Sequence, residues 1–353
     1  MPFFSVPDVK LKGIAACVPG HIEHNRDFLH LTEKELSFML KTIGVDSKRK
    51  AQPSVTCSDL CFKSAEALLK SLDWAPEEVE ILIFVSQTRD FLLPCTAIVL
   101  QDRLGLSKSC IAFDVPLGCS GYPYGISVIA GMMSSAKIKK GLLLCGETSA
   151  RLISPEDKRT FPLFGDAGSA TALEYVEGCG EIVFSTGSNG SDYDAIIVPE
   201  GGSRTLLGDG SPEAEKRQPG YRKGGSRLQM DGSRVFEFSV DTVPKSVNEL
   251  FNGTGYSPDT IDFFLMHQAN LVMNETIRKK LKFPPEKVPY SLKDFGNTSS
   301  ASIPLTMVTQ IKDELSKQKC SLLMSGFGVG LSWASLILQT NDIYIHDLIE
   351  YDG

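Results

Sequence analysis

The sequence has no uninterrupted apolar segment of about 20 residues, the length that a membrane-spanning helix needs, so we expect no membrane protein. Its first eight residues lack the basic start and apolar stretch of a signal peptide, so none is expected. Basic residues are fewer than acidic ones, 36 against 43, and the net charge of −7 argues against general nucleic-acid binding. These absences predict a protein with no membrane and no nucleic-acid partner.

The sequence also lacks a cysteine pattern typical of disulfide pairing. Its nine cysteines are odd in number, and several lie in apolar, strand-like segments. This usage is typical of reduced thiols in a cytoplasmic protein rather than of a disulfide framework. Cys57 and Cys61 are four residues apart on an expected helix. No second pair accompanies them, so we interpret them as core residues and predict no metal site.

The length and an internal repeat predict a duplicated fold. At 353 residues, with 42% hydrophobic and 22% charged residues, the chain is an ordinary globular protein that is long for one core. Residues 80–88 resemble 261–269, residues 142–147 resemble 322–327, and residues 118–120 correspond to 296–298, at offsets of 181, 180 and 178. Three pairs in the same order indicate two related halves, which we place at residues 1–178 and 179–353.

Apolar strands alternate with helical patterns in each half, and this alternation predicts parallel sheets covered by helices. If the halves are fused about a pseudo-twofold axis, Cys119 and Asn297 occupy equivalent places near that axis. His267 ends a strand of the second half. Because sites in open α/β sheets form beyond the carboxyl ends of strands, we expect these three polar side chains to converge.

Cys119 is the most informative residue of the chain. An apolar strand over residues 111–113 runs into a turn with Pro116 and Gly118, and a long apolar helix is predicted after Gly121. The partial positive charge of a helix N-terminus favours the thiolate, the nucleophilic form of cysteine. A small buried core residue is the alternative interpretation, since that is the usual role of a free cysteine.

His267 is the best-placed histidine to act with Cys119. The other four lie in the polar N-terminal stretch or the acidic C-terminal tail, at positions 21, 24, 30 and 346. A hydrogen-bonded structural histidine is the alternative. Asn297 has a helix cap as its alternative, which does not exclude a catalytic role.

Five motifs in this order carry a family resemblance: Gly118-Cys119-Ser120-Gly121, Phe164-Gly165-Asp166-Ala167-Gly168, His267-Gln268-Ala269-Asn270, Gly296-Asn297-Thr298-Ser299 and Gly326-Phe327-Gly328-Val329-Gly330. Together they resemble the thiolase superfamily, and specifically β-ketoacyl-acyl-carrier-protein synthase III. The similarity extends from about Lys10 to Leu338. It implies an α/β protein with a duplicated, layered α-β-α-β-α fold and pseudo-twofold symmetry. The last motif resembles the Gly-rich loop that such enzymes place over the nucleophile.

The resemblance implies a decarboxylative Claisen condensation of an acyl thioester with a malonyl thioester, as in fatty acid biosynthesis or a specialised lipid, glycan or secondary-metabolite pathway. Cys119 would carry the acyl group, and the backbone N–H groups of Cys119 and Val329 would form the oxyanion hole. His267 and the amide of Asn297 would stabilise the enolate. No cofactor is implied, because coenzyme A or the phosphopantetheine of an acyl carrier protein carries the substrates.

The resemblance also implies a homodimer and a set of substrate contacts: Leu93, Phe38, Arg151, Phe236, Asn270 and Phe327. Leu93 matches the residue that this family sends across the dimer interface to floor the acyl pocket of the partner subunit. Phe38 and Thr42 stand where housekeeping enzymes carry a Trp and an Arg for the coenzyme A nucleotide. A phosphate contact is therefore missing, which favours a carrier-protein donor.

Two surface segments bear on partners. Val272 stands where the family has a carrier-docking Arg, but Arg278, Lys279, Lys280 and Lys282 follow on the same expected helix. These basic side chains would attract an acidic carrier protein. The alternative interpretation is that they form an ordinary solvent-exposed face of the helix. Residues 201–228 are rich in Gly, Ser, Arg and Lys, which predicts a long surface loop or a lid.

Two other functions compete with condensation. An acyltransferase or thioesterase would use the same acyl-Cys119 but pass the acyl group to an alcohol, an amine or water. A non-catalytic, carrier-binding partner subunit would need none of this chemistry. The presence of Cys119, His267 and Asn297 together argues against the last function and favours the first.

Overall fold

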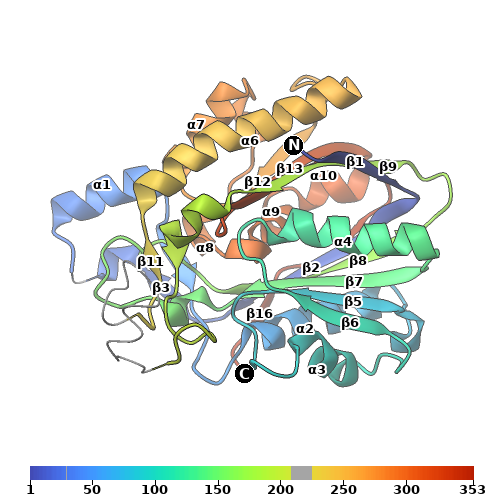
Figure 1. Ribbon diagram of the computed structural model, residues 1–353, viewed down its shortest axis with the longest axis horizontal. Coiled ribbons are helices and arrows are strands. Elements are labelled where there is room, and N and C mark those ends of the chain that lie inside the picture. Colours follow the sequence, from blue (N-terminus) through green and yellow to red (C-terminus); the bar gives the residue numbers. More distant parts are fainter. Residues whose placement is uncertain (29, 208–224) are drawn as a thin grey trace.

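Two β-sheets lie face to face in the computed structural model, which describes residues 1–28, 30–207 and 225–353 (Figure 1). The first sheet has the strand order β15-β2-β8-β7-β5-β6, with β16 also paired to β2, and the second has the order β1-β9-β14-β13-β12. Two short pairs, β3-β4 and β10-β11, lie outside these sheets. The strands are β1 (Phe3–Pro7), β2 (Val9–Pro19), β3 (Ile22–His24), β4 (Ser47–Arg49), β5 (Ile81–Val85), β6 (Ile111–Val115), β7 (Lys140–Glu147), β8 (Ala167–Tyr175), β9 (Glu181–Ser188), β10 (Ile196–Ile197), β11 (Gln229–Met230), β12 (Phe263–Met266), β13 (Cys320–Gly328), β14 (Ser332–Thr340), β15 (Tyr344–Ile345) and β16 (Ile349–Tyr351).

Helices form layers between and outside the sheets (Figure 1). Helices α4 and α9 contact both sheets from between them, α2 and α3 cover the outer face of the first sheet, and α6 covers the outer face of the second. This arrangement confirms the predicted α-β-α-β-α layering. The helices are α1 (Glu33–Ile43), α2 (Cys57–Ser71), α3 (Thr96–Arg103), α4 (Gly121–Ala136), α6 (Gly232–Thr254), α7 (Leu271–Lys280), α8 (Leu292–Phe295), α9 (Ser302–Gln310) and α10 (Lys312–Lys317), with short 3₁₀ turns at η1 (Asn25–Asp27), η2 (Pro76–Glu78), η3 (Ser149–Leu152), η4 (Gly190–Ala195), η5 (Pro285–Lys287) and η6 (Ser299–Ala301).

Local sequence signals fix the ends of several helices. Thr32 and Thr56 each begin a helix with a capping box, in which the hydroxyl accepts a backbone N–H three residues on. The Asp231 side chain caps α6 by accepting from the N–H groups of the next turn. Gly44 and Gly255 end α1 and α6 in the left-handed conformation, which costs glycine little because it has no Cβ.

The strand order confirms the predicted duplication. The order β2-β8-β7-β5 in the first sheet is repeated as β9-β14-β13-β12 in the second. In both, the last two strands are parallel and the others pair antiparallel. The boundary that we place at residue 178 falls between β8 and β9. Each end of the chain pairs with the sheet of the other half. The N-terminal strand β1 belongs to the second sheet, and the C-terminal strands β15 and β16 belong to the first.

The sheets are mixed, so the expectation of parallel sheets is wrong for two of the six strand pairs of the first sheet and for three of the four pairs of the second. β13 runs into β14 through a short loop over residues 329–331, and so short a connection permits only an antiparallel pair. β7 and β8 are likewise antiparallel, because the segment between them holds only η3 and no helix long enough for a crossover. Strands joined through α3 and α4 are parallel, as predicted.

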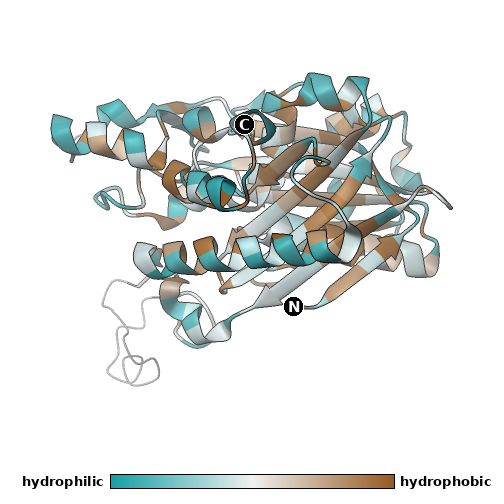
Figure 2. Ribbon diagram, turned by 90° about the horizontal axis from the view of Figure 1, so that it is seen from above, coloured by the Kyte–Doolittle hydropathy of each residue, from teal (hydrophilic) through white to brown (hydrophobic). Residues whose placement is uncertain are grey.

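The largest hydrophobic cluster fills the space between the two sheets. It joins Ile83 and Val85 of the first sheet to Leu265 of the second through Ile126 of α4 and Met307 of α9. Figure 2 shows the apolar residues concentrated on the strands, with hydrophilic residues on outer faces of the helices. Cys57 and Cys61 lie in a second cluster under α2, which confirms that they are core residues. Across the described ranges, no helix combines the length and the apolar character that crossing a membrane demands.

Candidate active site

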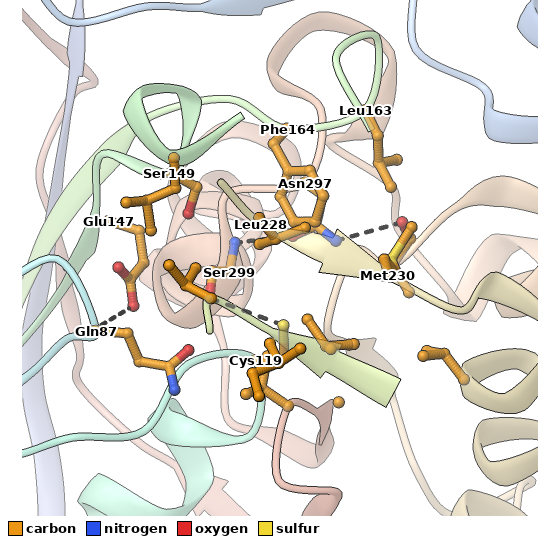
Figure 3. A pocket seen from close by; sticks show the side chains of 18 of the residues that line it. Gln87, Cys119, Glu147, Ser149, Leu163, Phe164, Leu228, Met230, Asn297 and Ser299 are labelled. Carbon is orange, nitrogen blue, oxygen red and sulfur yellow. Dashed lines mark hydrogen bonds between the residues drawn. The ribbon is translucent and has the colours of Figure 1, made fainter. Parts of the chain in front are cut away.

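A cavity of about 660 Å³ opens where the two halves meet, and Cys119, His267 and Asn297 all line it. Figure 3 shows Cys119 and Asn297 at this cavity. Cys119 comes from the turn between β6 and α4, His267 follows β12, and Asn297 follows α8. The structure therefore brings together the three side chains for which the sequence predicts convergence. All three are buried to more than nine-tenths of their surface.

Cys119 lies two residues before the first residue of α4, with its side chain 7% exposed. Its Sγ is 3.7 Å from the hydroxyl oxygen of Ser299, which belongs to the second half of the chain (Figure 3). Ser299 has a φ of 51°, in the left-handed region that a residue with a Cβ rarely adopts. A strained backbone of this kind is common at functional sites.

Burial raises the pKa of the Cys119 thiol to about 11, so the expectation of a thiolate in the free enzyme is not supported. The hydroxyl of Ser299 and the backbone N–H of Val329 act in the opposite direction, and the Glu147 carboxylate adds to the rise. The free energy lost when the thiolate is removed from water exceeds the stabilisation that the helix N-terminus and these hydrogen bonds provide. The thiol of the free protein is therefore protonated at neutral pH.

The Gly-rich loop passes directly over the nucleophile, as the resemblance implies. A Cβ at Gly328 would lie 2.7 Å from the Cβ of Cys119 and 3.1 Å from its Sγ. A Cβ at Gly326 would lie 2.9 Å from the Cys119 carbonyl oxygen. Because no side chain fits there, glycine lets the backbone of the loop approach the sulfur. The N–H of Val329 is thereby brought to the side of the cavity that holds the thiol.

His267 is a buried, neutral histidine. Its Nδ1 is 2.8 Å from the hydroxyl oxygen of Ser302, and its ring meets the edge of Phe327 at 5.6 Å between centroids. Burial lowers the pKa of His267 to about 3, while the carbonyl of Ser299 acts to raise it. A neutral imidazole carries one N–H, so Nε2 faces the cavity either as a donor or as an acceptor.

Asn297 has its amide held in one orientation. Its Oδ1 accepts the N–H of Ser299 at 2.9 Å, so its Nδ2 faces the other way, 3.4 Å from Nε2 of His267 and 3.4 Å from the carbonyl of Ala269. Gly296 precedes it with a φ of 65°. Asn297 thus satisfies the N–H of the following turn, as a cap would, and presents its amide nitrogen to the cavity.

A buried carboxyl group also lies beside the nucleophile, and sequence reasoning missed it. Glu147 ends β7, lines the cavity and accepts hydrogen bonds from the N–H of Gln87 at 2.9 Å and the hydroxyl of Thr88 at 2.8 Å. Burial raises its pKa to about 7. Its position at a strand end was visible in the sequence, but its burial was not.

The cavity has walls of different character. Figure 3 shows Gln87, Glu147 and Ser149 on one side of Cys119, with Leu163 and Met230 on the other. The apolar lining continues with residues that sequence reasoning did not single out: Ile196 and Ile197 of β10, Leu228 just before β11, and Val235 of α6. Such a wall suits the hydrocarbon part of a ligand.

The predicted substrate contacts divide into two groups. Asn270 and Phe327 line the cavity, although the Asn270 side chain also caps α7 by accepting the N–H of Met273 at 2.8 Å. The other four lie outside the cavity wall of this chain, so their contacts with substrate stay predictions. Phe38 is 70% exposed on α1, Leu93 is 87% exposed, Phe236 packs in the cluster under α6, and Arg151 lines a separate cavity and donates to the carbonyls of Gln52 and Val55.

The surface segments are only partly described. On α7, Arg278 forms a bidentate ion pair with Glu275, and Lys280 donates to the carbonyl of Val240, while Lys279 and Lys282 are exposed. Residues 208–224 of the predicted 201–228 loop lie outside the described residues. In the part of the chain that is described, no group of three or more His, Cys, Asp or Glu side chains is arranged to hold a metal ion.

The comparisons with known proteins agree with this geometry. Residues 113–190 match the model of the 3-oxoacyl-[acyl-carrier-protein (ACP)] synthase III family, and residues 251–340 match its C-terminal model. A β-ketoacyl-[acyl-carrier-protein] synthase III of Fusobacterium nucleatum is 30% identical over 332 residues, covering 94% of this chain and 98% of that protein. The crystal structure of a 3-oxoacyl-(acyl-carrier protein) synthase from Burkholderia xenovorans is 38% identical, with a TM-score of 0.93, and the match covers 99% of both chains.

Proposed function

The chain belongs to the 3-oxoacyl-[acyl-carrier-protein] synthase III family, and we propose that it condenses an acyl thioester with a malonyl thioester, with loss of CO₂, through an acyl-Cys119 intermediate. It is an enzyme of the acyltransferase class. One observation carries the proposal: Nε2 of His267 and Nδ2 of Asn297 lie 3.4 Å apart in the cavity that holds the Cys119 thiol.

Acylation of Cys119 is the first half-reaction. The sulfur attacks the carbonyl carbon of the acyl thioester, the C–S bond of the donor breaks, and the proton of Cys119 leaves on the departing thiol. The N–H groups of Cys119 and Val329 stabilise the oxyanion of the tetrahedral intermediate. A preorganised donor of this kind is worth about 3–4 kcal/mol of barrier.

Condensation is the second half-reaction. The bond between the malonyl carboxylate and its CH₂ breaks, CO₂ leaves, and the electron pair forms an enolate whose oxygen takes hydrogen bonds from His267 and Asn297. The enolate carbon then attacks the acyl carbonyl, and the C–S bond to Cys119 breaks. The released thiolate takes up a proton, which its high pKa favours, and the free enzyme returns.

The donor is an acyl carrier protein in this proposal, rather than coenzyme A. The hydroxyl of Thr42 donates within its own helix, to the carbonyls of Phe38 and Met39, and so it offers no free donor to a nucleotide phosphate. Lys279 and Lys282 leave exposed positive charge at the end of α7, where an acidic carrier would dock.

The working form is a homodimer in this proposal. The segment Phe91-Leu92-Leu93 is 53%, 70% and 87% exposed in the single chain, while Phe91 and Leu92 also line the cavity. An apolar patch at the edge of a site is unfavourable in water and suits a subunit interface. Leu93 then contributes to the acyl pocket of the partner subunit.

Asn297→Asp tests the division between the two half-reactions. A carboxylate at this position repels the developing enolate oxygen, where the amide donates a hydrogen bond. We expect Cys119 to be acylated at close to the wild-type rate, while CO₂ release from a malonyl carrier falls at least about 100-fold. The two rates are measured separately, by intact mass with peptide mapping and by trapped CO₂.

The wild-type protein supplies the decisive comparison. An acyl adduct on another cysteine, with Cys119 free, would exclude the mechanism. The wild-type protein could also release no CO₂ from malonyl thioesters and yet transfer the acyl group to a hydroxyl, an amine or water. That result would identify the enzyme as an acyltransferase or thioesterase instead.

A further inference from the structure

The hydrogen on His267 must be on Nε2 if this ring is to donate to an enolate. The imidazole is neutral, since burial lowers its pKa to about 3, and a neutral imidazole has one N–H. If that hydrogen is on Nδ1, Nε2 is an acceptor and repels the enolate oxygen. The group that contacts Nδ1 therefore determines whether Nε2 of His267 can donate a hydrogen bond to the enolate oxygen.

Ser302 is the group that contacts Nδ1, at 2.8 Å, and both side chains are only 1% exposed. Its hydroxyl can donate to Nδ1 or accept from it. The Ser302 oxygen already lies 3.4 Å from the backbone N–H of Gln268, which donates to it. The hydroxyl can also donate to the carbonyl of Ser299 at 2.7 Å, which accepts the backbone N–H of Ser302 as well, so this carbonyl and Nδ1 compete for the one hydroxyl hydrogen.

Asn297 supplies the second donor that an enolate needs, beside Nε2 of the ring. Its Oδ1 is taken by the N–H of Ser299 at 2.9 Å, so its Nδ2 is fixed as a donor 3.4 Å from Nε2. The Asn297 amide also reaches the carbonyl of Ala269, so it has an acceptor other than His267. With hydrogen on Nε2, two donors converge on one point in the cavity, which is the arrangement that a developing oxyanion requires.

We propose that Ser302 is a positioning residue that holds His267 in the Nε2–H form by donating its hydroxyl hydrogen to Nδ1. This inference rests on the proposed condensation and assigns a residue that prepares its second half-reaction. Without the hydroxyl, the imidazole keeps the carbonyl of Ser299 as a neighbouring acceptor. A carbonyl can only accept, so it draws the hydrogen to Nδ1 and turns Nε2 into an acceptor.

Ser302→Ala and Ser302→Thr test this assignment. In Ser302→Ala we expect acylation of Cys119 within about twofold of wild type and CO₂ release from a malonyl carrier lowered about 100-fold, the effect of losing one preorganised donor. Ser302→Thr keeps the hydroxyl and recovers most of the CO₂ release. Ser300→Ala is the matched control, because the Ser300 hydroxyl is buried on the same turn but donates to the carbonyl of Val85, away from His267.

The ¹⁵N chemical shifts of His267 give a readout that a merely structural role would not move. We expect the Nε2–H form in the wild-type protein with a malonamyl thioester, which cannot lose CO₂, and the Nδ1–H form in Ser302→Ala. An Nδ1–H form in this wild-type complex overturns the inference without any variant. Equal loss of acylation and CO₂ release in Ser302→Ala, or no loss in either, also overturns it. Wild-type protein that releases no CO₂ at all refutes the proposed function instead.

Discussion

The hydroxyl oxygen of Ser120 lies 2.7 Å from the hydroxyl oxygen of Ser332. Ser120 follows the nucleophile and Ser332 begins β14, so this contact joins the two halves of the chain. Ser332 in turn donates to the carbonyl of Val329 at 2.8 Å. The pair therefore fixes the Gly-rich loop, and with it the N–H of Val329, at a set distance from Cys119.

Ser332→Ala should loosen this loop and slow acylation. Losing an oxyanion donor costs about 100-fold to 1,000-fold, and a donor that is displaced keeps part of its effect, so we expect about a tenfold slower adduct formation on Cys119. Stopped-flow mixing with an acyl thioester, followed by intact mass, measures the rate. Ser335→Ala is the control, since Ser335 pairs with Ser325 on the same two strands away from the loop. Equal effects of both variants would contradict the prediction.

Ser299 should tune the reactivity of Cys119 through its hydroxyl. Because this hydroxyl acts to lower the thiol pKa, its removal should raise that pKa further, and we expect alkylation of Cys119 by iodoacetamide to become slower at neutral pH, by up to about tenfold. Ser299→Gly and Ser299→Ala separate two causes, because glycine tolerates the φ of 51° and alanine does not. Equal shifts in both variants identify the hydroxyl. An unchanged pH profile would show that the contact at 3.7 Å has no influence.

The duplication, the layers and the convergence of Cys119, His267 and Asn297 could all be predicted from the sequence. Each depends on patterns along the chain: a repeat of apolar strands, glycines that permit close approach, and polar residues at strand ends. The mixed pairing of the sheets was missed because it depends on connection length. The 329–331 loop contains too few residues for a crossover helix, a feature that the strand pattern alone did not reveal.

What the sequence did not give is the burial of single groups. The high pKa of Cys119 follows from desolvation, which no motif encodes. Ser299 and Ser302 were part of a quoted motif or followed it, but their roles depend on a turn that directs one hydroxyl to the sulfur and the other to the imidazole. The apolar wall from β10, β11 and α6 is assembled from distant segments without a shared signature.

The exposed apolar edge of the first sheet should be buried in a homodimer. Ile111 of β6 is 40% exposed on the last strand of that sheet, and Leu93 is 87% exposed. An open, apolar edge strand is prone to pair with another chain. Light scattering at micromolar concentration should give a dimer, and Ile111→Lys should shift it toward monomer. A stable wild-type monomer would contradict the proposed dimer.

Glu147 should make the stability of the protein fall as the pH rises from about 4.5 to about 7. Burial raises its pKa from 4.5 to about 7, so within this window the folded protein holds a proton that the unfolded chain has released. The free energy of unfolding then decreases with pH, by up to about 3 kcal/mol, and stays lower above the window. Glu147→Gln removes this titration while its amide oxygen can still accept the N–H of Gln87.

The difference in unfolding free energy between Glu147→Gln and wild type should therefore grow in favour of the variant from pH 5 to pH 8. Urea unfolding followed by circular dichroism at both pH values measures it. Glu77→Gln serves as the control for replacing a carboxylate by an amide, because Glu77 is exposed. A Glu147→Gln difference that stays constant with pH would mean that the carboxyl remains ionised in the folded protein, stabilised by the Gln87 and Thr88 hydrogen bonds.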